Sequence, residues 1–445
     1  MAEHRPLKVL IAGAGIGGLA AAIALRQQGH VVEVRHSRFH LTMTNTSSFS
    51  KDPASPAKLA PQFILPQISR RFSSDLVWIP KPTEPRRIAD SPCLMHPGSL
   101  ALPRRMMRND WFFIQRAGLH RMLKDAATGP EGKGTAAALN TGCSVTNVDC
   151  STGTITLEDG RTFSGDLVIV ADGVHSQSRR TISGVERTPF SAGKCCYRWL
   201  VPTEIVKSDP GTRPLVERPG LFVDIEGDDK RIVIYPCGNN TITNCLAFVS
   251  MEDMWDPEKP GAMKTAKEAM IAAYSNLSDG FRRLLEIAPD GSESDSGVKP
   301  WPLLDMAQLP TWINGRAALL GDAAHPFLPS SSGNFGLTVA DLGQGGAIAV
   351  EDAVSLGVLL PLGTSPSEVP ARLELYQQCR KERAERVQEH TRIRGRHPDG
   401  SEGPPPSTEE YMGFIQHAIM HDEWKHSTDV LNNYLAAQEQ GKARI

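Results

Sequence analysis

The feature that most constrains this chain is a glycine pattern that directly follows a short apolar run. Residues 8–12, Lys-Val-Leu-Ile-Ala, have the composition of a buried strand. Gly13, Gly15 and Gly18 then form a G-x-G-x-x-G pattern that leads into an alanine-rich helix. The first glycine permits a tight turn, the second lets the backbone approach a pyrophosphate, and the third lets the helix pack on the strand. The pattern therefore predicts a βαβ unit that binds a dinucleotide at the helix N-terminus.

This pattern alone does not separate FAD from NAD(P). The acidic residue that binds the ribose hydroxyls is expected at the end of the second strand, where this sequence has His36. Glu33 lies earlier, in mid-strand, and we do not expect it to reach the carboxyl edge. With Arg35 and Arg38 beside it, His36 suits a 2′-phosphate, so an NADPH site in the first domain is a real alternative here.

Two later segments favour FAD. Residues 166–180, DLVIVADGVHSQSRR, and residues 315–329, GRAALLGDAAHPFLP, each read as a buried strand that ends on an Asp-Gly or Gly-Asp pair. In this order after the first motif, they resemble the second and third fingerprints of class A flavoprotein monooxygenases, the group of p-hydroxybenzoate and salicylate hydroxylases. The resemblance covers about residues 7–39 and 111–360.

The resemblance assigns expected roles to individual residues. Asp172 and Gly173 match the middle motif, where the aspartate supports the flavin pyrophosphate region and the nicotinamide donor, and Arg179 closes that motif. Asp322 matches the aspartate that binds the ribityl hydroxyl of the flavin. Arg116, in QRAGLH, matches an arginine that heads a helix and contacts the flavin.

Two stretches depart from the family pattern. A helix that aims its N-terminal amides at the flavin is expected soon after the Gly-Asp strand. Gly346 lies in such a helix start, residues 343–353, but residues 330–342 intervene. The Pro- and Ser-rich residues 40–105 lack the expected Gly/Ala-rich turn and helix. One interpretation is a divergent enzyme with unusual loops. The other is a faulty gene model, in which a retained intron adds residues 330–342 and a shifted reading frame alters residues 40–105. We favour the second slightly, because the flanking motifs are intact. On that interpretation, deleting residues 330–342 is predicted to keep or raise flavin binding and activity.

Residues 190–250 alternate between apolar and polar in short runs joined by turns, which predicts an antiparallel sheet. Its CCYRWLVP and RIVIYPC segments resemble paired strands that face the flavin in natural-product hydroxylases. By that resemblance Arg198 and Tyr235 are candidate catalytic residues, because an arginine can hold a phenolate or steady the peroxy oxygen and a tyrosine can orient the substrate. The alternative is an Arg–Tyr pair that only caps the sheet. We expect His325 to be structural rather than a base.

The sequence thus predicts an α/β fold with a Rossmann-like FAD-binding domain (GR2-type), an antiparallel β-sheet substrate domain and a helical C-terminal tail. The expected boundaries are residues 1–185 and 299–362 for the two FAD-binding parts, 186–298 for the substrate domain and 363–445 for the tail. In that tail, the Glu and Arg spacing of residues 379–397 indicates a solvent-exposed helix face.

The resemblance implies an FAD-dependent oxidoreductase, a monooxygenase that consumes NAD(P)H and O2. It would hydroxylate or epoxidise an aromatic or indole-like small molecule through a flavin C4a-hydroperoxide, in natural-product biosynthesis or aromatic catabolism. A non-oxygenase flavoprotein, such as a reductase or halogenase, and a catalytically impaired FAD-fold protein are the alternatives.

Composition and charge exclude several classes of partner and location. The net charge of −2 gives no general attraction to nucleic acid. No apolar run approaches the roughly 20 residues of a membrane span. The eight cysteines lack metal-site spacing, and the sequence begins without a signal-peptide core. We therefore expect a cytoplasmic protein with reduced thiols and no metal site.

Overall fold

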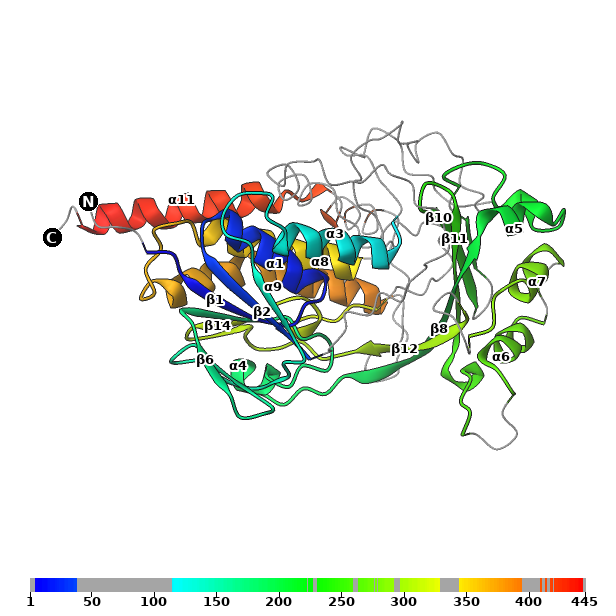
Figure 1. The fold of residues 1–445 in the computed structure, drawn as a ribbon, viewed down its shortest axis with the longest axis horizontal. Helices are drawn as coiled ribbons and strands as arrows, with labels where there is room; N and C mark the ends of the chain where they lie inside the picture. The colour runs from blue at the N-terminus through cyan, green and yellow to red at the C-terminus, as the bar shows by residue number, and fades with distance from the viewer. Residues whose placement is uncertain are drawn as a thin grey trace.

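The computed structural model describes residues 5–37, 114–221, 223–226, 230–258, 263–275, 277, 279–291, 297–328, 344–393, 409, 413, 417–418 and 420–442. Residues 40–105 and 330–342, singled out from the sequence, lie outside these described residues. The described chain is built on one large parallel-type sheet, one antiparallel sheet and a small three-stranded sheet (Figure 1).

The larger sheet has six strands in the order β13-β14-β7-β1-β2-β3. Its inner strands run parallel and are almost wholly buried, as their continuous apolar runs require. Four strands of this sheet come from the first predicted FAD-binding part and two, β13 and β14, come from the second. The domain is therefore discontinuous in sequence. The strands are β1 (Lys8–Ala12), β2 (Val31–His36), β3 (Ala138–Thr141), β7 (Leu167–Val170), β13 (Ile313–Asn314) and β14 (Ala317–Leu319).

Small residues let the helices of this domain pack closely. A Cβ atom on Gly357 of α8 (Gln344–Leu359) would lie only 2.9 Å from the Cβ of Ala24 in α1 (Ile16–Gln27). α3 (Arg116–Thr128) lies beside α1 in Figure 1. The domain also contains β4 (Val145–Asp149), β5 (Thr154–Leu157), β6 (Thr162–Ser164) and α4 (Arg179–Ser183).

The second sheet has five antiparallel strands in the order β12-β8-β11-β10-β9, which confirms the antiparallel sheet predicted for this region. Helices α5 (Thr203–Ser208), α6 (Ala266–Ala273) and α7 (Asp279–Glu286) cover one face, under which Tyr197 and Trp199 pack (Figure 1). The strands are β8 (Phe190–Pro202), β9 (Val223–Glu226), β10 (Arg231–Cys237), β11 (Ile242–Ser250) and β12 (Lys299–Asp305).

Strand β12 connects the two large sheets. It lies at the start of the range 299–362 expected for the second FAD-binding part, but it pairs with β8 of the five-stranded sheet. We therefore propose a boundary after Asp305 rather than before residue 299.

The solvent-exposed face predicted for residues 379–397 is confirmed for only one side of the described helix, where Glu382, Arg386 and Glu389 are exposed, whereas the other side is buried. Residues 379–397 lie largely in α9 (Val369–Ile393), where the side chains of Arg380, Arg383 and Arg392 are 0%, 5% and 8% exposed. Their guanidinium groups pair with carboxylates of other elements, including α8 and α11 (Glu423–Lys442). Because those pairs satisfy the charges away from water, a strongly polar helix face can be buried.

Two further observations concern membrane-spanning helices and the cysteine residues. Within the described ranges, no helix combines the length and apolarity needed to cross a membrane. The seven cysteines in those ranges are buried and carry free thiols. Burial raises the pKa of the Cys195 thiol to about 11, so this thiol is unreactive at neutral pH.

Candidate active site

The glycine and aspartate motifs meet at the carboxyl end of the parallel sheet. Strands β14, β7, β1 and β2 are neighbours, and each leads directly into one motif. The motif residues at their ends are Asp322, Asp172, Gly13 and His36, respectively. Open α/β sheets bind ligands at this edge, where the strand order reverses. We call it the cofactor edge.

The glycine turn leaves room for an anion. Gly13 has φ +110°, and a Cβ atom there would lie 2.2 Å from the carbonyl oxygen of Ala171. A Cβ atom on Gly18 would lie 2.0 Å from the carbonyl oxygen of Gly13, so the turn packs directly under the helix. At Gly15, by contrast, no atom of the described residues lies within 4 Å of an added Cβ, and none of their side chains caps α1. The open space and the uncapped N–H groups fit a dinucleotide pyrophosphate.

Arg179 joins the second and third motifs. Its buried guanidinium group donates hydrogen bonds to the carbonyl oxygens of Val174 at 2.7 Å and Ala323 at 2.8 Å. The peptide segments that carry Asp172 and Asp322 are therefore held at a fixed separation. Both aspartate side chains remain exposed, as a ligand-binding role requires.

The carboxyl group of Asp172 is electrostatically unusual. It keeps an exposed surface, but protein atoms surround its other sides, and this desolvation raises its pKa. The nearby polar groups of Ser176 and Gln177 and the charge of Arg179 oppose the shift without cancelling it. A carboxyl group with a shifted pKa at the ligand-binding edge of an α/β sheet is a candidate functional group. The neighbouring Gly173 has φ +89° and open space around its α-carbon.

Arg35, invoked above for a 2′-phosphate, already has partners. Its guanidinium group pairs with Glu33 at 2.6 Å and stacks 3.7 Å from the ring centre of Phe163. Arg38 lies outside the described residues. Of the two arginines in the alternative NADPH site of the first domain, Arg35 is thus already engaged by protein groups.

Two histidines hold the glycine turn from opposite sides. The N–H of Ala14 donates to Nδ1 of His36 at 3.5 Å, and the carbonyl oxygen of Ala14 contacts Nε2 of His120 at 2.7 Å. Burial lowers the pKa of His120, which favours its neutral form. Arg116 is exposed at the first residue of α3, one helical turn before His120, so this contact fixes its position relative to the turn. Our sequence reasoning missed His120 because its partner is 106 residues away.

The start of α8 lies against the third motif. Gly346 is half-buried in the first turn of α8, and a Cβ atom on Gly345 would lie 3.8 Å from the ring of Phe327. His325 is buried against Trp312, with 4.8 Å between the ring centres, and its Nε2 lies 2.7 Å from Asp352 of α8. These contacts give His325 a structural position, in line with our expectation.

Arg198 and Tyr235 lie on the same face of the five-stranded sheet, opposite the face that α5, α6 and α7 cover. Tyr235 is buried on this face in a cluster with Leu328, which ends the third-motif segment. Asn244 lies directly across from Tyr235, and its Oδ1 accepts a hydrogen bond from Nε of Arg198 at 3.3 Å. The Nδ2 group of Asn244 is buried and has no hydrogen-bond partner among the described residues. Sequence reasoning missed Asn244, which only the strand register identifies.

Known proteins resemble the chain over most of its length. Residues 141–391 match a family described as "FAD binding domain". Hispidin-3-hydroxylase of Neonothopanus nambi is 33% identical over 402 residues, which are 86% of each chain. The FAD-dependent monooxygenase cfoG of Aspergillus candidus is 30% identical over 430 residues, 94% of this chain and 93% of that protein. Salicylate hydroxylase of Pseudomonas putida is 31% identical over 244 residues, 52% of this chain and 51% of that enzyme.

Solved structures share the fold. CtdE in complex with FAD has a TM-score of 0.63 at 18% identity, covering 96% of this chain and 99% of its own. A salicylate hydroxylase substrate complex has a TM-score of 0.60 at 19% identity, covering 96% and 98%. These similarities confirm the predicted Rossmann-like FAD-binding fold with an antiparallel sheet and C-terminal helices.

Proposed function

This chain belongs to the FAD-dependent monooxygenases of the salicylate hydroxylase type, and we propose that it uses NAD(P)H and O2 to hydroxylate a phenolic or other electron-rich aromatic small molecule. It is an oxidoreductase with FAD as its cofactor. The named hydroxylases among its relatives support the aromatic substrate class.

The polar group formed by Arg198, Asn244 and Tyr235 carries the proposal. It lies on a largely apolar sheet face that also contacts Leu328, at the end of the third motif. An apolar surface with a few convergent polar groups suits an aromatic ring that bears a hydroxyl. The unpartnered Nδ2 of Asn244 supports this proposal, because a buried donor without an acceptor is costly and a substrate oxygen would satisfy it.

We propose a division of labour between the two sheets. When bound and reduced, FAD supplies the activated oxygen that is transferred. At the cofactor edge, the amides beside Gly15 hold the pyrophosphate, and Asp322 binds the ribityl chain. On the substrate face, Arg198 holds a phenolate oxygen and Tyr235 orients the ring. The surrounding apolar side chains exclude water, which protects the reactive oxygen from wasteful release as peroxide.

The test measures coupling between cofactor oxidation and product. Wild-type protein is supplied with FAD and with either NADH or NADPH. Each assay contains one candidate substrate, which is salicylate, hispidin or a member of a panel of substituted phenols and indoles. NAD(P)H consumption, peroxide formation and hydroxylated product are then quantified. Arg198→Gln should retain FAD but lower product formation about 10- to 100-fold, which is the effect of losing a charged hydrogen bond. Tyr235→Phe should raise the share of NAD(P)H that ends as peroxide.

Tyr197→Phe is the matched control, because Tyr197 lies on the opposite, helix-covered face and bonds the carbonyl oxygen of Asp253 at 2.9 Å. It should affect stability but not coupling. Wild-type coupling in both Arg198→Gln and Tyr235→Phe would remove the proposed roles. Reduction or halogenation of a substrate, without oxygenated product, would instead identify a flavoprotein of another kind.

A further inference from the structure

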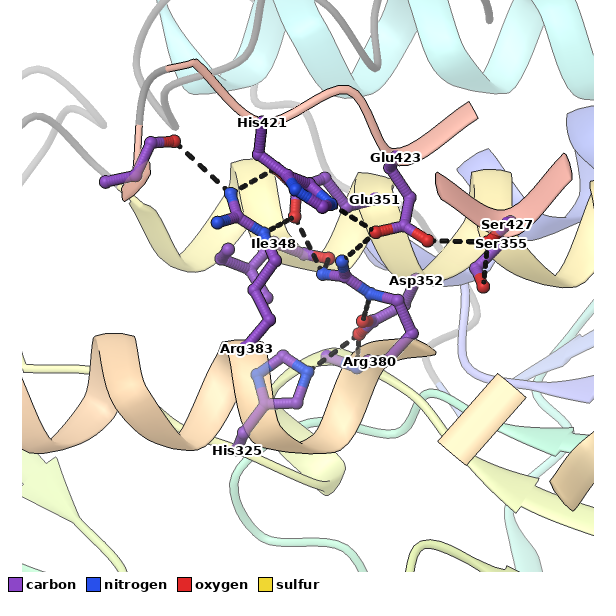
Figure 2. A network of polar contacts seen from close by, with 12 residues as sticks. His325, Ile348, Glu351, Asp352, Ser355, Arg380, Arg383, His421, Glu423 and Ser427 are labelled. Atoms are coloured by element: carbon purple, nitrogen blue, oxygen red, sulfur yellow. Dashed lines mark hydrogen bonds and ion pairs between the residues drawn. The ribbon is translucent and has the colours of Figure 1, made fainter. Parts of the chain in front are cut away.

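A buried network of charged side chains lies beside the third motif and connects it to the C-terminal helix (Figure 2). Its carboxylates come from α8 and from the start of α11, and its guanidinium groups come from α9. Nothing in the proposed reaction uses this network directly. It consists of His325, Glu351, Asp352, Arg380, Arg383, His421, Glu423 and the serine pair Ser355–Ser427.

Asp352 is the member that touches the cofactor edge. Its side chain is 0% exposed, and its Oδ2 accepts hydrogen bonds from the backbone N–H of Gly321 at 3.0 Å and from Nε2 of His325 at 2.7 Å. Its Oδ1 accepts a third bond, from Nε of Arg380 at 2.9 Å. Although burial opposes ionisation, the charges of His325 and Arg380 hold the pKa of Asp352 below its ordinary value. One ionised carboxylate of α8 therefore fixes the turn that begins the third motif.

The same arginine carries the connection onward. Arg380 is fully buried, contacts Glu351 at 2.8 Å and forms a further ion pair with Glu423, the first residue of α11. Glu423 also accepts a hydrogen bond from Oγ of Ser427 at 2.6 Å and lies 2.8 Å from Nε2 of His421. Glu351, His421 and Glu423 approach one another closely enough to ligate a cation, but two arginines already neutralise the carboxylates. The network is therefore a connection rather than a metal site.

The turn and the start of α8 must keep a fixed separation if both bind one flavin. Asp322 follows Gly321 in the turn, whereas Gly346 lies in the first turn of α8. A binding constellation of this kind tolerates displacements of only about 0.5 Å. Gly321 has φ +62°, and a Cβ atom on it would lie 3.1 Å from the Cβ of Ala349, so the turn already sits against α8. Asp352 adds the directional bond that sets how the turn is oriented.

We propose that Asp352 is a positioning residue for FAD, which holds the Gly321–Asp322 turn against α8, and that Glu423 supports it through Arg380. The proposal rests on the proposed placement of FAD at the cofactor edge. It assigns a part in cofactor binding to the C-terminal helix α11, which packs on α8 and α9.

Replacing Asp352 with asparagine keeps the shape of the side chain but not its bonding capacity. An amide has one acceptor oxygen and one donor nitrogen, so it cannot accept from Gly321, His325 and Arg380 with the present geometry. Glu351 offers a matched control on the neighbouring residue. It pairs with Arg383 through two bonds of 2.8 Å and with Arg380, so, like Glu423, it reaches the third motif only through Arg380 and has no direct bond to it in the described contacts.

The experiment compares Asp352→Asn, Glu351→Gln and Glu423→Gln in three measurements: the melting temperature of the FAD-free protein, the dissociation constant for FAD, and the midpoint potential of the bound flavin. Asp352→Asn and Glu351→Gln should lower the melting temperature to a similar degree. Asp352→Asn should weaken FAD binding most, by about tenfold or more, which corresponds to roughly 1.4 kcal/mol, and shift the midpoint potential. Glu423→Gln and Glu351→Gln, which act only through Arg380, should change both FAD properties in the same direction but much less.

Equal FAD affinity and potential in Asp352→Asn and wild type would overturn the proposal, as would equal losses in Asp352→Asn and Glu351→Gln. If Asp352→Asn does not fold, His325→Leu gives the same comparison, because leucine has no donor for Asp352 and leaves the Arg380 pair intact. Unchanged FAD affinity in Asp322→Ala would instead overturn the proposed placement of FAD at the cofactor edge. The two failures can therefore be told apart.

Discussion

The cofactor edge and the buried charge network are both polar and both assembled from distant segments, but they treat their polar groups in opposite ways. At the edge, the space before Gly15 is open and the side chain of Asp322 is exposed. In the network, Asp352 and Glu423 are fully buried and share Arg380 as a partner. Polar groups left without protein partners are available to a ligand, whereas polar groups that are satisfied internally hold the fold together.

The largest effect is expected where the edge depends on backbone geometry. Gly13→Ala places a Cβ atom 2.2 Å from the carbonyl oxygen of Ala171, at a φ of +110° that alanine rarely adopts. The backbone of β1 or β7 must shift, and we expect a loss of about 4 kcal/mol or more. Denaturant unfolding of the FAD-free protein measures it. Near wild-type stability would show that the turn is more adaptable than its contacts indicate.

Arg380→Met tests the network from within. It leaves Glu351, Asp352 and Glu423 buried without their shared cation, and breaking such a pair costs about 3–5 kcal/mol. Lys425→Met is the control, since Lys425 pairs with an aspartate on the exposed side of α11. That change should alter the free energy of unfolding by less than about 0.5 kcal/mol. Similar losses in the two variants would remove the distinction between buried and exposed charges.

The pH dependence of stability gives a smaller effect. Burial opposes ionisation of Glu351, but the charges of Arg383 and Arg380 prevail and lower its pKa from 4.5 to about 2. A carboxyl whose folded pKa is depressed stabilises the protein above its unfolded pKa, and this contribution is lost as pH falls from 4.5 towards 2. Glu351→Gln should therefore flatten the decline of unfolding free energy in that window. Urea titrations at several pH values would reveal it, and parallel curves for both proteins would refute it.

The sequence predicts the edge far better than the network, for a physical reason. Gly13 has a φ of +110°, and a Cβ atom on Gly18 would collide with the carbonyl oxygen of Gly13, so the turn itself requires both glycines and the motif is visible in a few adjacent letters. The same holds for the alternating strands of the second sheet. Arg380 carries no such signal, because its partners Asp352 and Glu423 are 28 and 43 residues away.

The sequence of α9 is compatible with both an exposed and a buried position for its charged residues. Lys381 and Glu385 form the expected i,i+4 pair, at 2.6 Å, on the same helix whose arginines are buried. Only the packing of α8 and α11 against α9 decides which charges are enclosed. Asn244 was missed for a similar reason, because its contact with Arg198 depends on strand register rather than on sequence proximity.

The central claim is that the open space at the N-terminus of α1 binds FAD and is not needed for folding. Gly15 has an extended backbone, φ −74° and ψ −175°, and no atom of the described residues lies within 4 Å of an added Cβ, so a side chain can start there without a backbone clash. The decisive measurement is the FAD dissociation constant of Gly15→Val, determined beside the melting temperature of the FAD-free protein. We expect a nearly unchanged melting temperature and a loss of FAD affinity of about 100-fold or more, since the side chain would occupy the pyrophosphate position. Wild-type FAD affinity in a folded Gly15→Val protein would contradict the account.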